Sequence, residues 1–392
     1  MKFKIERKRL QAALQKVMRT AAPLSAVKLL SEALSGVLVE ADSDKRMLVL
    51  TATDLTVSMQ MKLKEVEVEE AGTAVVRAKI LVEMLDRMQD EIAVCSALNN
   101  IVTLHCGRSV FRGPVMAAKD FPRIALVYPD NTIRVTGLNL LAKQAVTVVS
   151  ERNDNPMFQG VQMRFSPSVT TATSSDGIRM VKSKNDGMAD GNLDLFVPER
   201  ALKILCGIAK SDDDLFVGVV NNIAVFMTSE FVFNTRLTNG NLDKIETMME
   251  KIEAERSVTV NTKSFAQAVD TLSSACYGCD PCVNLTLTTT SMLLWTDNEN
   301  GHSQIEVDAE KSTSMLGKVV HYRPNFILEA LRLCSGTVTV DFDQRGIMRL
   351  RSSTTDYVIS PRTPARVKAA ETTEKVIKTK KGKAAKSSEQ AA

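Results

Sequence analysis

A short segment that recurs along this chain constrains its fold more than any other feature. Residues 99–111 begin with Asn-Asn-Ile and end on Phe, and residues 221–233 repeat that start and that ending at the same spacing. A third copy runs from Ile347 to Tyr357, after a turn that replaces the Asn pair. Successive copies are 122 and 124 residues apart, which indicates three copies of one structural unit.

A second landmark follows the same period. Thr53-Asp54 recurs as Ser175-Asp176 and as Thr296-Asp297, which we interpret as turn chemistry. A chain of 392 residues is long enough for three units that each bury a core. We therefore expect domains at residues 1–127, 128–252 and 253–367. The remainder, 368–392, is rich in Lys and poor in large apolar residues, which predicts a disordered tail.

Each unit shows the pattern strand, helix, strands, helix, strands. In the first helix, Leu10, Leu14 and Val17 belong to one apolar stripe that suits packing on a sheet, and the opposite face carries Lys and Arg. Asp176-Gly177 lies between two strand-like runs, which predicts a hairpin turn. The expected helices cover residues 6–21, 78–92, 136–152, 198–211, 262–275 and 323–334.

Charge is distributed unevenly in this chain. The net charge of +4 comes from the tail, where seven Lys face three Glu, so the rest of the chain is neutral. The six expected helices nevertheless carry more Lys and Arg than Asp and Glu. If their outer faces share one surface, that surface has positive potential and suits phosphates. The alternative is that these helix faces are simply solvated.

The number of helices sets the size of any opening they could enclose. Six helices, each about 10 Å across, would leave a hole of roughly 9 Å, too small for a duplex of roughly 20 Å. Twelve would leave about 28 Å. A head-to-tail pair of chains, in which the third unit of one meets the first unit of the other, supplies twelve.

The composition also disfavours several classes of protein. No apolar run approaches the ~20 residues of a membrane span, and the start has no apolar signal core, so we expect a soluble cytoplasmic protein. Seven Cys suit free thiols. Three His, no Gly-Lys-Ser/Thr phosphate loop and no His-Glu-x-x-His pair predict no enzyme and no cofactor.

Several motifs, in order along residues 1–363, carry a family resemblance. They are Met1-Lys2-Phe3-Lys4-Ile5-Glu6-Arg7, Thr51-Ala52-Thr53-Asp54-Leu55, Gly107-Arg108-Ser109 with Asp120-Phe121-Pro122, Ser175-Asp176-Gly177-Ile178-Arg179 and Tyr357-Val358-Ile359-Ser360-Pro361. With these motifs the chain resembles the bacterial sliding clamps, the beta subunits of DNA polymerase III. The resemblance implies an α+β fold of three clamp-type domains, each with two helices packed on antiparallel sheets, forming half of a ring.

The resemblance also implies a function. A homodimeric ring would encircle duplex DNA, act as a processivity factor, and tether DNA polymerase, clamp-loader subunits and other DNA enzymes through short linear peptides. Contacts to phosphates alone are independent of sequence and permit sliding. An aromatic content of 5% disfavours a single-strand binder, which needs stacking platforms. The cations expected to face DNA are Lys8, Lys16, Arg19, Lys28, Lys79, Arg87, Lys143, Arg152, Arg200, Lys203, Lys210, Lys263, Arg323 and Arg332.

Partner peptides, by the same resemblance, bind a pocket built from the second and third units. After Asn239-Gly240 the chain departs from the family, because a Pro and an Arg pair are replaced, and only Met248 is carried over there. Ser360 and Arg362 stand where the family has Met, which alters the expected peptide specificity. The pocket residues are Phe158, Ser175, Gly177, Ile178, Arg179, Met180, Met248, Val358, Ile359, Ser360, Pro361 and Arg362.

The dimer contact is implied by the resemblance alone. It would use Ile80 and Phe111 of the first unit, and Ser274 and Ala275 of the third. Ser274 and Ala275 are smaller than the aliphatic pair usual in the family, which predicts a weaker dimer. The loop at residues 21–28 lacks the Arg that the family aims at DNA, and Lys28 is its nearest substitute.

Two alternatives stay open at the level of sequence. The altered pocket and the tail suit a specialised clamp paralogue that serves repair or a mobile element. Cys276, Cys279 and Cys282 form Cys-x2-Cys-x2-Cys, which suits a zinc or iron–sulfur site if a fourth ligand exists. No Cys or His follows closely enough to complete such a site, so we expect no metal.

Overall fold

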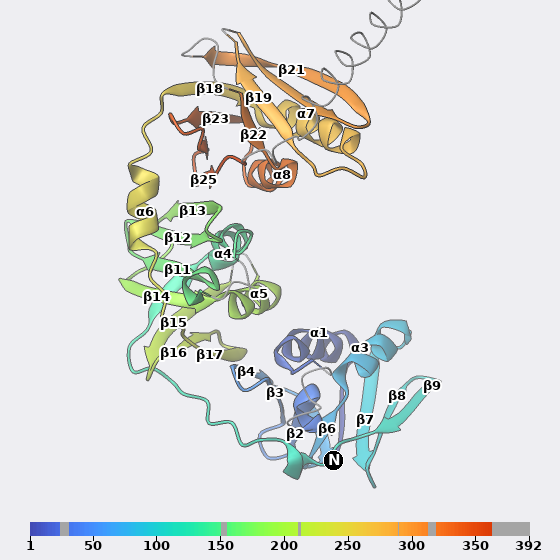
Figure 1. Ribbon diagram of the computed structural model, residues 1–392. Coiled ribbons are helices and arrows are strands. Elements are labelled where there is room, and N and C mark those ends of the chain that lie inside the picture. Colours follow the sequence, from blue (N-terminus) through green and yellow to red (C-terminus); the bar gives the residue numbers. More distant parts are fainter. Residues whose placement is uncertain (24–30, 150–154, 211–212, 289, 313–318, 363–392) are drawn as a thin grey trace, which may run out of the picture. The chain divides into compact units, whose positions relative to one another are not determined.

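The computed structural model describes residues 1–23, 31–149, 155–210, 213–288, 290–312 and 319–362 (Figure 1). The chain divides into two compact units. The first contains Met1–Ile252 and Ser353–Val358, and the second contains Glu253–Ser352 and continues from Ile359. In the described ranges, no helix is both long enough and apolar enough to cross a lipid bilayer.

The first unit begins with the first repeat, whose described residues form two helices and nine strands. The helices are α1 (Arg7–Val17) and α3 (Ala78–Arg87), with 3-10 turns at η1 (Met18–Thr20), η2 (Glu32–Ser35) and η3 (Ala118–Asp120). The strands are β1 (Lys2–Glu6), β2 (Val37–Asp42), β3 (Met47–Thr53), β4 (Val57–Leu63), β5 (Glu67–Glu70), β6 (Gly72–Val76), β7 (Ile92–Leu98), β8 (Ile101–Cys106) and β9 (Ser109–Pro114).

The second repeat completes most of the first unit. Its helices are α4 (Leu138–Ala145), α5 (Glu199–Ile208) and α6 (Asp243–Glu250), with the 3-10 turn η4 (Pro156–Phe158). Its strands are β10 (Ile133–Thr136), β11 (Gly160–Phe165), β12 (Val169–Ser175), β13 (Arg179–Asp186), β14 (Leu193–Pro198), β15 (Asp214–Val220), β16 (Ile223–Met227) and β17 (Phe231–Arg236).

The third repeat supplies the second unit and one strand, β25, that begins in the first unit. Its helices are α7 (Thr262–Ala275) and α8 (Pro324–Arg332). Its strands are β18 (Arg256–Asn261), β19 (Val283–Leu287), β20 (Ser291–Asn298), β21 (Gly301–Ser312), β22 (Val320–Tyr322), β23 (Thr337–Phe342), β24 (Met348–Arg351) and β25 (Thr355–Ile359).

Strand order repeats as the sequence does. The first repeat has the orders β1-β7-β8-β9 and β6-β2-β3-β4, and the second has β10-β15-β16-β17 and β14-β11-β12-β13. The second unit shows the same scheme in β18-β23-β24 and β22-β19-β20-β21. Neighbouring strands pair antiparallel. The α+β fold expected from the sequence is confirmed.

The recurrent sequence segments are hairpins. Asn99 and Asn100 both adopt positive φ (52° and 60°), as do Asn221 and Asn222, and Leu98 pairs with Ile101 across the first of these turns. Two successive positive-φ residues form the tight turn whose twist matches antiparallel strands, and Asn tolerates that backbone. In the third copy the Asp343 carboxylate accepts the Ile347 N–H at 2.7 Å and closes an equivalent loop.

All six helices expected from the sequence are present, although several end earlier than predicted. In α1 the buried side chains are Leu10, Ala13, Leu14 and Val17, which confirms the predicted apolar stripe. At the start of α7 the Asn261 side chain accepts the N–H groups of Lys263 and Ser264, which caps that helix. Helix α6 was not expected from the sequence.

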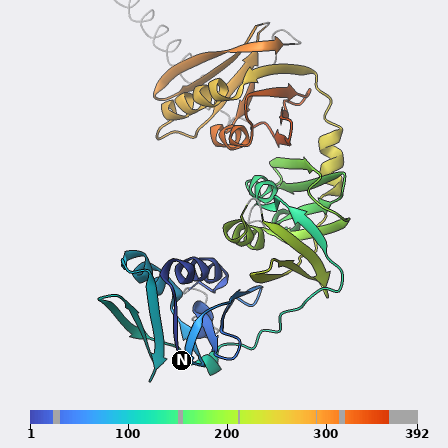
Figure 2. The same cartoon turned by 180° about the vertical axis from the view of Figure 1, so that it is seen from behind.

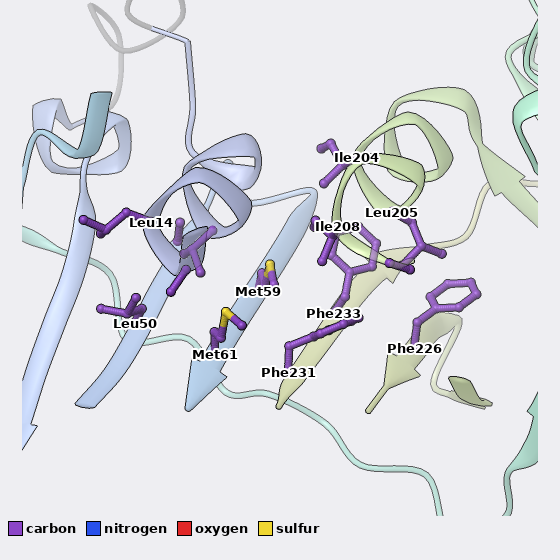
Figure 3. Close-up of a cluster of buried hydrophobic side chains, with 14 of the residues drawn as sticks. Leu14, Leu50, Met59, Met61, Ile204, Leu205, Ile208, Phe226, Phe231 and Phe233 are labelled. Atoms are coloured by element: carbon purple, nitrogen blue, oxygen red, sulfur yellow. The ribbon is translucent and has the colours of Figure 1, made fainter. Parts of the chain in front are cut away.

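The first two repeats are joined through a shared sheet and a shared core (Figure 3). Strand β17 pairs with β4, with Phe231 opposite Met61 and Phe233 opposite Met59. These side chains are buried, and they belong to one apolar cluster with Leu14 of α1 and with Ile204 and Ile208 of α5. We call this junction the seam. It places α1 beside α5, so the helices of both repeats become neighbours.

Truncation of the seam core is expected to destabilise the first unit. Phe233→Ala removes a ring that is fully buried and packs 6.2 Å from the Phe226 ring, centroid to centroid. Loss of a buried Phe costs about 3–5 kcal/mol of unfolding free energy. Phe216, 44% exposed, is the matched control, and Phe216→Ala should change stability little. Urea denaturation measures both, and equal losses would contradict this account of the seam.

Candidate functional site

The helices of the first unit form one continuous layer. Helix α1 contacts α3 on one side and α5 on the other, and α5 contacts α4. One helix of each repeat also packs on strands. Helix α1 packs on β3 and β4, and helix α4 packs on β12 and β13. Figure 2 shows the four helices following one another along one side of this unit. The outer faces expected to be basic in the first two repeats therefore share a surface.

Most of the cations predicted to face DNA are exposed. Of this set, Lys28 and Arg152 lie outside the described residues. In the first unit Lys16 is half-buried, and the exposed members are Lys8, Arg19, Lys79, Arg87, Lys143, Arg200, Lys203 and Lys210. In the second unit, where α7 contacts α8, the exposed members are Lys263, Arg323 and Arg332.

Two of these cations are already paired. Arg200 binds the Asp54 carboxylate with an N–O distance of 2.7 Å, and Lys203 binds Glu199. The other described members of the set form no ion pair with a carboxylate in the described part of the chain. Arg19, in the 3-10 turn η1 that follows α1, lies over Gly207 of α5. The free positive charge of the helical layer therefore comes mainly from lysines.

The predicted hairpin at Asp176-Gly177 is confirmed. The Asp176 carboxylate accepts the N–H groups of Ile178 and Arg179 at 2.9 and 2.7 Å, and the Ser175 hydroxyl accepts the Gly177 N–H at 3.1 Å. Thr53 and Asp54 hold the corresponding turn of the first repeat in the same way. Gly177 has φ of +87°, which favours glycine.

An apolar contact lies beside this turn. A Cβ added at Gly177 would stand 3.5 Å from the Phe158 ring, so the ring borders the turn. Ile178 is 47% exposed, while the Arg179 guanidinium is held by the Asp176 carboxylate at 2.9 Å. The structure thus brings Phe158 together with residues 175–179. There the exposed apolar side chain of Ile178 lies next to the fixed cation of Arg179.

Helix α6 occupies the segment in which the sequence departs from the family. An ion network attaches it to β11 and β13, because Arg164 binds Glu246 at 2.7 Å and also binds Asp243. Lys182 binds the same Glu246 at 3.0 Å and Glu250 at 3.3 Å. Sequence reasoning missed this network, although Asp243, Glu246 and Glu250 follow the i, i+3/i+4 spacing of one helical face. Met248, from the predicted pocket, is 58% exposed on this helix.

Met180 of β13 is half-buried, and the other pocket residues come from the last described part of the chain. Val358 is buried in the first unit. In the second unit Ile359 is buried, and Ser360, Pro361 and Arg362 are half-buried. The Arg362 N–H donates to the His321 carbonyl at 2.7 Å, and its guanidinium binds Asp280. Arg362 is thus fixed by contacts that the sequence did not indicate.

Each unit also presents a strand with a free edge. Strand β9 is the last of its sheet, and it carries half-buried Phe111 and exposed Arg112. In the second unit β21 pairs with β20 from Gly301 to Asp308, but pairs with β18 only from Ala309 onward. Among the described strands, none pairs with the outer edge of the earlier part. A groove of about 580 Å³ runs there, between α7 and residues Ile305–Ala309.

The four residues that the resemblance assigned to the dimer contact are all described. Ile80 is 40% exposed on α3, and Phe111 lies on β9. Ser274 is exposed and Ala275 half-buried at the end of α7. Phe111 lies on the free-edged strand β9, and the helix that ends at Ala275, α7, packs against β21. The role of these four residues in a dimer stays a prediction.

The three cysteines of the Cys-x2-Cys-x2-Cys run are all described. Cys276 is buried, with its Sγ 3.3 Å from the Thr296 hydroxyl, and Cys279 and Cys282 are half-buried. Across the described ranges, no cluster of three or more His, Cys, Asp or Glu side chains is arranged to hold a metal ion. The Cys-cluster alternative therefore has no support in this part of the chain.

Comparisons with known proteins agree with this architecture. Residues 1–125 match the family model of the DNA polymerase III beta subunit, N-terminal domain. The beta sliding clamp of Bacillus subtilis is 23% identical over 364 residues, covering 89% of this chain and 94% of that protein. That of Halalkalibacterium halodurans is 25% identical over 60% of this chain, and the match spans 66% of that protein, just under two thirds of its length.

A solved structure shares the fold. The Helicobacter pylori beta clamp, determined with a bound DNA ligase peptide, aligns with a TM-score of 0.77 at 18% identity. The alignment covers 93% of this chain and all of the other. The fold is therefore that of the sliding clamps.

The network at α6 is expected to make the first unit sensitive to acid. Burial raises the pKa of Glu246, but the nearby Thr173 hydroxyl, Lys182 and Arg164 outweigh burial, so the pKa lies below its ordinary value of 4.5. A lowered carboxyl pKa stabilises the fold at neutral pH, and this contribution is lost as the pH falls below about 4.5 through the folded-state pKa.

Thermal unfolding between pH 7 and pH 3 tests this dependence. Wild type should lose more stability than Glu246→Gln on acidification, because the variant has no carboxylate to protonate. Glu83→Gln, which changes an exposed carboxyl on α3, is the control and should follow wild type. Parallel curves for wild type and Glu246→Gln would contradict the assignment.

Proposed function

This chain belongs to the bacterial sliding clamps, the DNA polymerase III beta subunits, and from that premise we propose that it encircles duplex DNA as a processivity factor. The observation that carries the proposal is the helical layer α3-α1-α5-α4, whose exposed lysines, apart from Lys203, form no ion pair with a described carboxylate. Lysines facing phosphates attract DNA without reading its sequence, so the protein can slide.

We further propose that the ring is a head-to-tail homodimer of three-domain chains, each forming half of the circle. The free edge of β9 carries Arg112, whereas the free part of β21 carries exposed Glu306 and Asp308. Backbone groups on two free strand edges can pair with each other, and opposite charges fix which edges meet. Twelve helices, contributed by two chains, are the number that leaves room for a duplex.

Partner proteins bind, in this proposal, at the apolar surface beside the turn at residues 175–179. Exposed Ile178, the Phe158 ring and exposed Met248 supply apolar contact, and Arg179 supplies a fixed cation. The DNA ligase peptide on the Helicobacter pylori clamp supports a short linear ligand of this kind. We propose polymerase and clamp-loader subunits as its sources.

The proposed protein acts by binding and retention, and not by catalysis. Its domains would be residues 1–127, 128–252 and 253–367, and its place of action the cytoplasm, where the chromosome is replicated. The comparisons give no support to a specialised paralogue or a metalloprotein. The tail at residues 368–392 lies outside the described residues.

Retention on circular DNA tests the ring. After loading onto a nicked circle, the protein should persist on the circle and be lost when that DNA is linearised, because only free ends release a closed ring. Glu306→Lys/Asp308→Lys should abolish persistence while leaving affinity for a short duplex unchanged, since the lysine layer is intact. Glu253→Lys, a charge reversal at an exposed residue elsewhere in the second unit, is the control. Equal loss of wild type from circular and linear DNA would exclude a ring.

Peptide affinity tests the partner surface separately. Ile178→Asp should weaken binding of a labelled clamp-binding peptide from a bacterial DNA polymerase by about tenfold or more, equivalent to about 1.4 kcal/mol, because it places a charge on the apolar surface. Ile92 is 49% exposed on β7, close to the 47% of Ile178, and Ile92→Asp should have no effect. Fluorescence anisotropy measures both. An unchanged affinity for Ile178→Asp would place the peptide elsewhere.

A further inference from the structure

A cationic cavity of about 410 Å³ lies at the seam between the first two repeats. Its walls come from α1, the end of β4, the turn between β16 and β17, and Lys210 just after α5. The apolar residues Met61 and Leu63 of β4 also line it. We call it the seam pocket. Its charged lining residues are Arg9, Lys16, Lys62, Lys64, Lys210 and Glu230.

The geometry of α1 explains why two cations face this pocket. At about 100 degrees per residue, Arg9 and Lys16 lie about 240 to 260 degrees from Leu10, on the flank that faces away from α3. The opposite flank is occupied by Arg7 and Gln11, which hydrogen-bond to residues of α3 and the loop after it. Arg9 and Lys16 are therefore left to border the seam.

The strand side of the pocket is held in place by main-chain contacts. The Arg9 guanidinium donates to the Lys64 carbonyl at 2.6 Å, and the Lys62 N–H donates to the Glu230 carbonyl at 2.9 Å. Met61 pairs with Phe231 on the neighbouring strand. Because side chains alternate along β4, the Lys62 side chain points to the face opposite that of buried Met61. Lys62 therefore lines the pocket with its main chain and not with its ammonium group.

The charge balance of the pocket is positive. Arg9, Lys16, Lys64 and Lys210 form no ion pair with any carboxylate in the described ranges, and Glu230 is the one acidic residue of the lining. An adjoining cavity of about 330 Å³ shares Lys16 and Lys210 and adds two carboxylates. These already have partners, since Asp213 accepts the Lys210 N–H at 2.8 Å and Asp214 accepts the Thr136 hydroxyl at 2.8 Å.

The chemistry of the lining points to a phosphate ligand. Ammonium and guanidinium groups are the donors that bind phosphate oxygens in charge-assisted hydrogen bonds. None of the described residues that line the seam pocket is aromatic, so these residues offer no platform for stacking a base. Lys16 and Lys210 are shared with the lysine layer of the helices, so the pocket is continuous with the proposed DNA surface.

We propose that the seam pocket is a phosphate-binding subsite that holds the backbone of duplex DNA through Arg9, Lys16, Lys64 and Lys210. Arg9 and Lys64 extend the DNA contact beyond the outer faces of the helices to the junction of two repeats. The subsite rests on the proposed clamp function, because it takes its ligand from the duplex that the helical layer faces.

The salt dependence of duplex binding tests the subsite. Each phosphate contact contributes about 0.9 to the slope of log K against log salt concentration. Arg9→Gln/Lys64→Gln should lower that slope by about 2 for a labelled short duplex, measured by anisotropy with the full chain. Lys119→Gln/Lys184→Gln removes two exposed lysines of the first unit that lie outside the pocket and the helices, and should leave the slope unchanged.

The single variant Lys64→Gln shows whether a lower slope comes from the lost charge or from a disturbed fold. The Arg9 guanidinium binds the main-chain carbonyl of residue 64, so this variant keeps that contact and should lower the slope by about 0.9. Slopes equal to wild type in both pocket variants would overturn the subsite. If Lys79→Gln/Lys143→Gln lowers the slope in that case, the clamp proposal stands without the subsite. A wild-type chain with no salt-dependent affinity for the duplex would overturn both.

Discussion

The antiparallel pairing of β4 with β17 is the interaction on which the functional surface depends. It joins two repeats that would otherwise carry separate helix pairs, and it places α1 against α5. Burial of Phe233 and Met59 beneath those helices makes the junction a core and not a surface contact. The basic outer faces of four helices consequently act as one field, since charges on a common surface add at distances within about 10 Å, the screening length at 0.1 M salt.

The charges of that surface are arranged for weak, uniform attraction. Arg200 is fixed by Asp54 and Lys203 by Glu199, whereas the other exposed lysines of the layer form no ion pair with a described carboxylate and keep long flexible side chains. Flexible point charges bind phosphates without a fixed register, which suits a protein that must move along DNA. Retention then has to come from closure of the ring. The free edges of β9 and β21, with charges of opposite sign, are the part of the chain suited to that closure.

Much of the fold could be predicted from the sequence because the informative signals are local. Asn99-Asn100 and Asn221-Asn222 mark tight turns, and the stripe of Leu10, Leu14 and Val17 marks a helix on a sheet. The turn at Asp176-Gly177 was predicted for the same reason. Contacts between distant residues left no such signal. The binding of Arg164 and Lys182 to α6, the pairing of Arg200 with Asp54, and the meeting of Arg9 with Lys64 join residues far apart in sequence.

The central claim is that the helical layer, and not the strand side, faces the double helix. Site-specific photo-crosslinking tests it most directly, with a photoreactive side chain placed either at Lys143 on α4 or at Lys184 on β13, both exposed. With the protein loaded on circular duplex DNA, the account predicts cross-links from position 143 and none from position 184. Cross-links from position 184 alone, or equally from both positions, would contradict it.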